Sequence, residues 1–263
     1  MKPRRGSIVW WIVFLIGVVY FFLPLIATLD FSLKAKPAFA AYTNSFADPR
    51  FFSSLVYSFV IGLGTIAASM LLIVPTAYWV HLKVPRARTA VEFVTLLPFV
   101  IPPVVLVFGL IRVYSRPPLP LTNTDLGSSA LLVFAYVVLS LPYMYRAVDA
   151  GLRSIDIRTL TEAAQSMGAG WATILWRIIL PNLRVAVLSG AFLTLAIVLG
   201  EFTIASFLAR PAFGPYLSLL GNSKAYEPAA VSLISFGLTW LAMIVIAFIG
   251  RDSRSRIQIG GAH

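Results

Sequence analysis

Six long apolar segments constrain this chain more than any other feature of its sequence. They lie at roughly residues 8–29, 55–80, 91–111, 130–148, 185–208 and 229–250. Each approaches or exceeds the roughly 20 residues that an α-helix needs to cross a bilayer. Only 12% of the 263 residues are charged, whereas a soluble domain carries about a quarter. We therefore expect an all-α membrane protein with six transmembrane helices, organised as one domain over residues 1–263.

The positive charges are divided unevenly between the two ends of these segments. If the N-terminus lies inside, 14 of the 21 lysines and arginines fall on the cytoplasmic side. Membrane proteins keep an excess of these residues in cytoplasmic loops, so the pattern predicts an N-in, C-in orientation. The segment at 8–29 is too long for the core of a secretory signal, so we expect a retained helix. Topology thus accounts for the net charge of +11, and nucleic acid is not an expected partner.

One polar stretch interrupts the apolar pattern between the fourth and fifth segments. It reads EAAQSMGAGWATILWRIILP from Glu162 onward, within a loop at about 151–183. Thr159 and Glu162 have the spacing of a capping box, which predicts a helix start there. Gly168 and Gly170 are expected to end that helix, because glycine adopts the left-handed conformation without steric cost.

Apolar residues at helical spacing follow the two glycines. They are Trp171, Ile174, Leu175, Ile178 and Ile179. This periodicity predicts an amphipathic second helix that can lie at the membrane surface. Pro181 has no amide donor and suits the first turn of the next helix. The residues alone allow a hairpin that docks onto a partner or a surface hairpin without one.

Seven positions of this loop match the EAA loop of transmembrane subunits of importing ABC transporters. They are Glu162, Ala163, Ala164, Gly168, Ile178, Leu180 and Pro181. Over nearly its whole length the chain resembles a permease of the type I ABC importer fold, in which this loop is a cytoplasmic helix-turn-helix that docks onto an ATPase. The resemblance implies that Glu162 makes the charged contact with the ATPase. Ala163 and Ala164 would permit close approach, and Gly168 would set the turn.

The resemblance also implies a set of partners. An ABC ATPase dimer would hold ATP and Mg, a second permease subunit would complete the pathway, and a solute-binding protein would deliver cargo from outside, at a bacterial inner membrane. The sequence has no G-x-x-x-x-G-K-[ST] phosphate loop, so we expect no ATP site, no cofactor and no enzymatic activity in this chain. With no cysteine and only two distant histidines, His81 and His263, a metal site is not expected either.

The cargo is less constrained than the machinery. The phrases LTEAA at 160–164 and ILPNL at 179–183 resemble the second permease of spermidine/putrescine-type systems, a group that also serves opines and aminoalkylphosphonates. A polyamine or a related amine or opine is therefore the favoured cargo. The alternatives are an aminoalkylphosphonate, iron, an oxyanion or a sugar. A secondary transporter driven by an ion gradient and an intramembrane enzyme are rival functions from other classes.

Two features inside the apolar segments are candidates for the translocation pathway. Glu201 lies about two-thirds along the fifth segment, where a carboxylate faces either a cavity or a hydrogen-bonding partner. Pro102 and Pro103 interrupt the third segment, and such breaks occur where neighbouring helices or a water-filled cavity satisfy the freed carbonyl groups. Each feature has a plain alternative, which is a structural hydrogen bond for Glu201 and a simple kink for the prolines.

Overall fold

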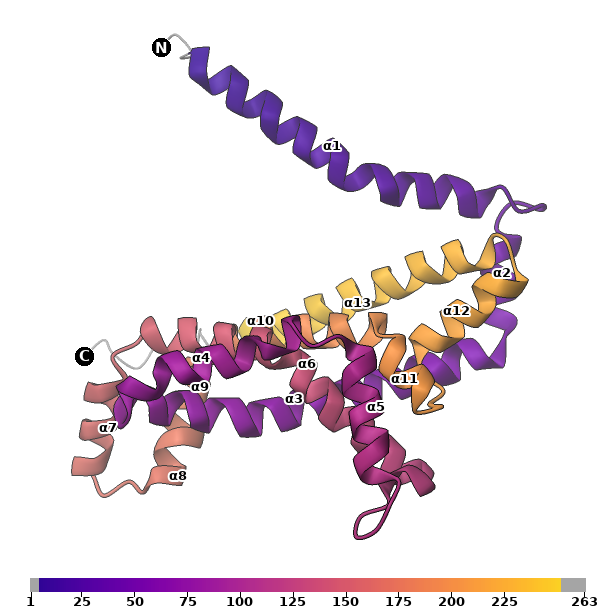
Figure 1. The fold of residues 1–263 in the computed structure, drawn as a ribbon. Coiled ribbons are helices and arrows are strands. Elements are labelled where there is room, and N and C mark those ends of the chain that lie inside the picture. The colour runs from indigo at the N-terminus through magenta and orange to yellow at the C-terminus, as the bar shows by residue number, and fades with distance from the viewer. Residues whose placement is uncertain (1–4, 252–263) are drawn as a thin grey trace. The chain divides into compact units, whose positions relative to one another are not determined.

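The computed structural model describes residues 5–251, and the basic residues and His263 in the two end segments lie outside the described residues. Within 5–251 the secondary structure is helical and contains no strand, as the sequence predicts (Figure 1). The chain divides into two compact units. One comprises Met1–Phe52 with Leu217–Leu238, and the other comprises Ser53–Tyr216 with Thr239–His263. The organisation as one domain stays a prediction.

The first unit contains the long N-terminal helix and a small polar junction. α1 covers Arg5–Leu33, and its segment Val9–Leu33 is long and apolar enough to cross a membrane. α2 covers Ala40–Ala47. The hydroxyl groups of Ser32 and Tyr42 share a hydrogen bond of 2.7 Å, which ties the C-terminal end of α1 to α2.

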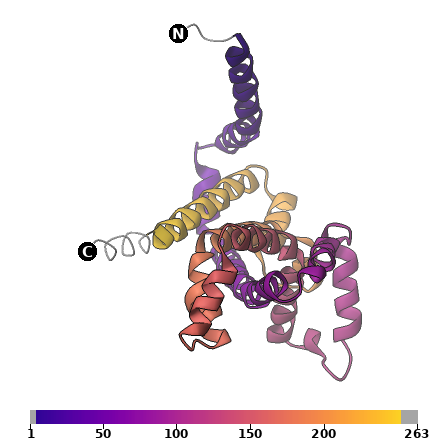
Figure 2. The ribbon, with the colours of Figure 1, turned by 90° about the vertical axis from the view of Figure 1, so that its left-hand side faces the viewer.

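Three long helices form the centre of the second unit. α3 covers Pro49–Leu82, α6 covers Asp125–Arg153 and α10 covers Arg184–Gly200. α10 packs along α6 (Figures 1 and 2). Gly190 makes this close approach possible, because a Cβ atom at that position would lie only 2.7 Å from the sulfur of Met144.

The third apolar segment is broken. It consists of η1 (Pro85–Ala87), α4 (Arg88–Leu96), η2 (Leu97–Phe99) and α5 (Pro103–Tyr114). The helix pair on the two sides of the break is bent by 97°. Pro102 has an extended ψ of 139°, and neither Pro102 nor Pro103 can donate a backbone hydrogen bond. The interruption predicted from these prolines is therefore present, and it is a sharp bend rather than a simple kink.

The fifth apolar segment is also broken, at Glu201. α10 ends at Gly200, Glu201 has an extended ψ of 127°, and the chain resumes as α11 (Thr203–Phe207). A continuous helix over 185–208, with Glu201 inside it, is therefore wrong. The physical reason is local, because the Glu201 carboxylate accepts hydrogen bonds from the amides of the next turn and so starts a new helix.

The remaining helices are short or belong to both units. They are η3 (Leu121–Asn123), α12 (Phe213–Ser223) and α13 (Glu227–Arg251). By length and composition, three described helices can cross a membrane, or up to five if each bent pair counts as one span. The count of six helices and the N-in, C-in orientation therefore stay predictions.

Candidate functional site

The first helix of the loop at 151–183 begins earlier than the sequence suggested. α7 covers Ile157–Ser166, and its N-cap is Asp156. The Asp156 carboxylate accepts hydrogen bonds from the Thr159 amide at 3.1 Å and the Thr159 hydroxyl at 2.7 Å. These bonds lower the pKa of the Asp156 carboxyl below its usual range. The expected capping box of Thr159 and Glu162 is wrong, because an aspartate three residues before Thr159 already satisfies its amide.

α7 has one face against the chain and one face exposed. Ile157, Thr161 and Ala164 are buried, and the Thr161 hydroxyl lies 3.0 Å from the Tyr78 hydroxyl of α3. Glu162 and Ala163 are exposed. Ala164 therefore allows α7 to approach its own chain closely, which differs from the expectation that it faces a partner.

The turn after α7 confirms one sequence prediction and corrects another. Gly168 has a φ of 79°, the left-handed conformation expected of it. The Ala169 amide bonds to the Ala164 carbonyl at 3.0 Å and the Gly168 amide to the Gln165 carbonyl at 2.9 Å, which is a Schellman motif. Gly170 has an extended backbone with ψ 164° and precedes the second helix, so it does not end the first.

The second helix of the loop is wider than an α-helix. It consists of α8 (Trp171–Thr173), the π-helical η4 (Ile174–Ile179) and α9 (Leu180–Asn182). The Leu180 amide bonds to the Leu175 carbonyl five residues earlier. Pro181 has no amide to bond the carbonyl four residues earlier, which favours this wider turn. The chain bends by 78° only after Asn182, so Pro181 closes the second helix instead of opening the next one.

The predicted amphipathic character of the second helix is confirmed. Ile174, Leu175 and Ile179 are buried, whereas the polar Thr173 and Arg177 are exposed. Trp171, which the periodicity places with the apolar residues, is 49% exposed. Ile178 and Leu180 are partly buried against the hydrophobic cluster that joins the hairpin to α3 and α6, whereas Pro181 is exposed. Ile178 and Leu180 therefore hold the helix in place.

The hairpin rests on the ends of α3 and α6. A single hydrophobic cluster joins Tyr78 of α3, Val148 and Leu152 of α6, and Ala164 and Leu175 of the hairpin. All five side chains are almost fully buried. Because closely packed side chains transmit displacement, we expect the hairpin and these two helix ends to move together as one rigid body.

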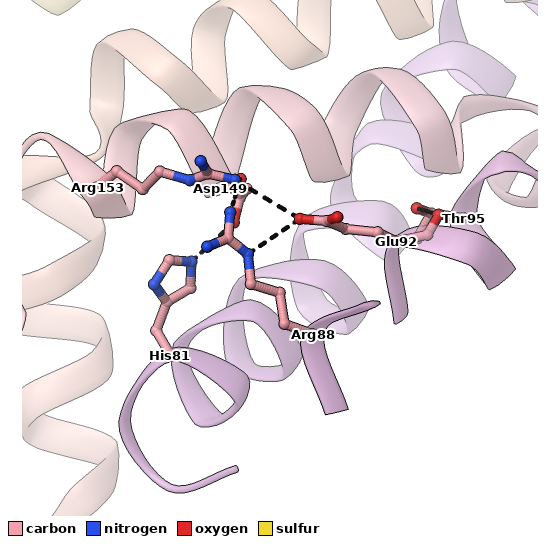
Figure 3. A network of polar contacts seen from close by, with 6 residues as sticks. All are labelled: His81, Arg88, Glu92, Thr95, Asp149 and Arg153. Carbon is pink, nitrogen blue, oxygen red and sulfur yellow. Dashed lines mark hydrogen bonds and ion pairs between the residues drawn. The ribbon is translucent and has the colours of Figure 1, made fainter. Parts of the chain in front are cut away.

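An ion-pair network centred on the buried Asp149 is made by residues of α3, α4 and α6 (Figure 3). Asp149 of α6 is 7% exposed, and its carboxylate contacts His81 Nε2 at 2.8 Å, Arg153 Nη2 at 2.6 Å and Arg88 Nη2 at 3.2 Å. Glu92 accepts a hydrogen bond from Arg88 Nε at 2.9 Å. The sequence analysis did not find this network. Its local signals are two pairs of opposite charge at a spacing of four residues, which suits one helix face.

The Glu201 carboxylate is hydrogen-bonded to a side chain of α6 and to backbone amides of α11. Tyr136 of α6 donates its hydroxyl hydrogen to Glu201 Oε2 at 2.9 Å, and the amides of Ile204 and Ala205 bond to the same carboxylate at 2.8–3.2 Å. The structural alternative for Glu201 therefore has direct support, and its role in a pathway stays a prediction.

The helices that follow the two breaks pack against each other. α5 begins at Pro103, α11 follows Glu201, and the two helices are in contact. The rings of Phe108 and Phe207 lie 4.8 Å apart between their centroids. An apolar hollow of about 170 Å³ lies between the α4–η2 side of the first break and α6. The structure thus brings Pro102, Pro103 and Glu201 to the ends of two adjoining short helices.

Metal chemistry finds no support in the part of the chain that the structure describes. Among residues 5–251 no group of three or more histidine, cysteine or acidic side chains is placed to hold an ion. The buried network around Asp149 contains two arginines, which repel a cation from that position.

Long apolar helices, of which three to five spans can cross a membrane, together with a partly exposed hairpin, are typical of a multi-pass membrane protein. The chain matches the family described as binding-protein-dependent transport system inner membrane component over residues 61–253. That match includes the hairpin, the Asp149 network and both broken segments. This protein therefore belongs to that family.

Curated relatives are ABC transporter permeases whose names give different cargoes. The chain is 30% identical over 207 residues to the probable ABC transporter permease protein y4fN of Sinorhizobium fredii, covering 75% of this chain and 35% of that protein. It is 26% identical over 243 residues to the molybdenum transport system permease protein ModB of Mycobacterium tuberculosis, covering 89% and 90%. It is 30% identical over 136 residues to the spermidine/putrescine permease PotC of Escherichia coli, covering 50% and 51%. The chain thus spans about a third of y4fN, half of PotC and nearly all of ModB.

A solved structure shares the fold. It is a bacterial alginate ABC transporter in complex with an alginate pentasaccharide-bound periplasmic protein. The similarity has a TM-score of 0.65 at 17% sequence identity and covers 97% of this chain and 98% of the other.

Proposed function

We propose that this chain is the permease subunit of an ATP-driven importer that receives its cargo from a solute-binding protein. Family membership supports this machinery. The observation that carries the proposal is the hairpin. α7 is capped at both ends, the Gly168 turn fixes the second helix, and the buried faces of both helices join the core of α3 and α6.

The exposed face of the hairpin is the proposed docking surface for the ATPase. Glu162 would accept a hydrogen bond from a basic side chain, and Ala163 beside it leaves room for close approach. Met167 is 80% exposed at the turn, and Trp171 is exposed at the start of the second helix. Exposed apolar side chains on the same hairpin as an exposed carboxylate suit a protein partner that buries them.

The remaining parts of the machinery follow from this assignment. An ABC ATPase dimer would hold ATP and Mg, so this chain is not itself an enzyme. A second permease subunit would complete the pathway, and a solute-binding protein would release cargo at the outer side. The chain would cross a bacterial inner membrane six times as one permease domain, with both termini in the cytoplasm.

Alternating access is the proposed mechanism. Closure of the ATPase dimer on ATP would draw the docked hairpins together and turn the helical bundles, so that the cavity opens outward. The two broken segments meet where α5 packs on α11, and broken helices in transporters typically line the cargo site. We place the pathway beside Pro102, Pro103 and Glu201 for this reason.

A polyamine or a related amine or opine is the proposed cargo. The resemblance of the hairpin sequence to polyamine permeases supports this choice. An aminoalkylphosphonate, iron, an oxyanion or a sugar is the alternative, because the relatives include a molybdenum permease as well as a spermidine/putrescine permease. Thermal-shift screening of the partner binding protein against these classes decides between them. Stabilisation by molybdate or sulfate alone would reject the amine.

Reconstitution tests the machinery. The chain, a second permease subunit and the ATPase that co-purifies with them would be placed in vesicles with the loaded binding protein. We expect uptake that requires ATP and the binding protein. Uptake by this chain alone, driven by an imposed proton or sodium gradient, would establish a secondary transporter instead.

A further inference from the structure

We propose that Asp149 is a positioning residue that locks the end of α6 to the turn between α3 and α4, so that displacement of the hairpin reaches the bent segment α4–α5. The inference rests on the proposed function of the hairpin and adds the route by which its movement enters the bundle. Asp149 is almost fully buried, and three basic side chains from three helices converge on its carboxylate.

The location of Asp149 couples it to the hairpin. α6 ends at Arg153 and α7 begins at Ile157, so only the three residues Ser154–Asp156 connect them. The Ser154 amide bonds back to the Gly151 carbonyl at 3.1 Å, and the Asp156 side chain caps α7. Because the connection is short and hydrogen-bonded, it allows little independent motion, and α7 and the end of α6 move together.

The network then passes from α6 to α4. Arg88, at the start of α4, contacts Asp149 through Nη2 and Glu92 through Nε. Arg153 also reaches Glu92 at 3.6 Å. Figure 3 shows the Arg88 guanidinium between the two carboxylates. His81 adds a contact from the end of α3, so one aspartate holds α3 and α4 against α6.

Charge balance makes Asp149 the central member. The network contains two guanidinium groups and two carboxylates, with His81 as a further donor. Loss of the Asp149 charge leaves the Arg88 and Arg153 guanidinium groups with only Glu92 as an acidic partner, and all three of these side chains are partly exposed. The pairing lost between α6 and α4 is the 3.2 Å contact of Asp149 with Arg88, and the tie that stays is the longer, 3.6 Å contact of Arg153 with Glu92.

The elements beyond α4 are the ones that a transport cycle must move. α4 leads through η2 to the 97° bend, and α5 after the bend packs on α11. A force applied to the hairpin therefore has a continuous path through α6 and Arg88 to the two broken segments. With Asp149 changed, the ATPase can still dock and hydrolyse ATP, but its closure is not passed on.

The test measures coupling in the complete transporter. Asp149→Asn would be reconstituted with the ATPase, the second permease and the loaded binding protein, and solute imported per ATP hydrolysed would be determined. We expect this ratio to fall about tenfold while ATP hydrolysis persists. Asp149→Glu should restore much of the ratio, because it keeps the charge. Asp125→Asn is the matched control, since it removes an ion pair with Arg210 at the other end of the same helix, and it should leave the ratio near that of the unmodified chain.

The outcomes separate this inference from the proposed function. If the unmodified complex shows no ATP-driven uptake, the proposed function fails. If it does, and Asp149→Asn lowers uptake and hydrolysis in equal proportion with a lower melting temperature, Asp149 is only structural and the inference is overturned. Should Asp149→Asn not assemble, Arg153→Gln changes a half-exposed side chain and removes its 3.6 Å contact with Glu92, the second tie between α6 and α4. It should reduce the ratio to a smaller extent, and an unchanged ratio would equally reject the inference.

Discussion

Glu162 is an exposed carboxylate on the outer face of α7, beside Ala163 and away from the buried face of Thr161 and Ala164. We expect Glu162→Lys to abolish uptake and co-purification of the ATPase while membrane insertion stays normal. Reversing one partner of a desolvated charge pair costs on the order of 2–5 kcal/mol. The yield of ATPase in an affinity purification measures the effect. Asp30→Lys reverses an exposed charge on α1 and should leave that yield unchanged. A Glu162→Lys complex with normal yield and uptake would remove Glu162 from the docking surface.

Gly168 and Gly170 form a natural pair for a second test. Gly168→Val places a β-branched residue at a φ of 79°, which costs on the order of 1–2 kcal/mol. Neither glycine has an atom close enough to clash with a new side chain, so the cost is one of backbone conformation. Gly170 has an extended backbone that suits valine, and Gly170→Val should be much milder. Solute imported per ATP reports the difference. Equal ratios in the two variants would show that the turn does not set the hairpin.

At the scale of single residues, a local structure can be predicted from the sequence where one residue determines it alone. Only glycine adopts the Gly168 conformation freely, so its position predicts the turn. Asp149 carries no such signal, because its partners Arg88 and His81 are 61 and 68 residues away and meet only after the helices pack. The prediction of where α7 starts was wrong for a different reason. Asp156 and Thr159 both have side chains that cap helices, and the sequence does not show which one takes the amide.

At the scale of elements, the break between α10 and α11 is the clearest example of a feature that hydropathy does not predict. Hydropathy averages over a break, so the sequence located the fifth segment but not its interruption. The same average located the third segment, where Pro102 and Pro103 gave a local signal that the helix ends. At Glu201 the signal is a side chain that replaces backbone partners, and apolar residues on both sides conceal it.

Glu201→Gln tests what this break requires. We expect a lower yield and melting temperature of the assembled complex, with uptake falling in proportion. A carboxylate offers two accepting oxygens to Tyr136 and the α11 amides, whereas an amide side chain offers one. Tyr136→Phe, which removes only the hydroxyl, should give a smaller loss of the same kind. Unaltered stability with a higher solute concentration for half-maximal uptake would instead place Glu201 in the pathway.

At the scale of the whole molecule, α6 orients the second unit. Its 29 residues correspond to a length of about 44 Å, enough to cross a bilayer. Near its start, Ser129 and Asp125 bond to Tyr57 and Arg210, and near its end, Asp149 bonds to His81 at the end of α3. Residues around 57 and 210 thus share one side with the start of α6, and residues around 81–92 share the other side with the hairpin.

Reporter fusions test whether the hairpin lies where an ATPase can reach it. We expect fusions at residues 40, 120 and 220 to report the outside, and fusions at 85, 165 and 260 to report the cytoplasm. The physical reasons are the excess of lysine and arginine around the second set and the ends of α6, which place 120 and 165 on opposite sides. The fusion at residue 40 is the most informative of the six. It depends on α1 crossing the membrane, and the exposed apolar surface of Val9–Leu33 is what such a crossing would cover. If 40 and 165 reported the same side, one of the three segments between them, α3, the broken segment Pro85–Tyr114 or α6, would not cross the membrane, and the docking surface around Glu162 would have to be assigned again.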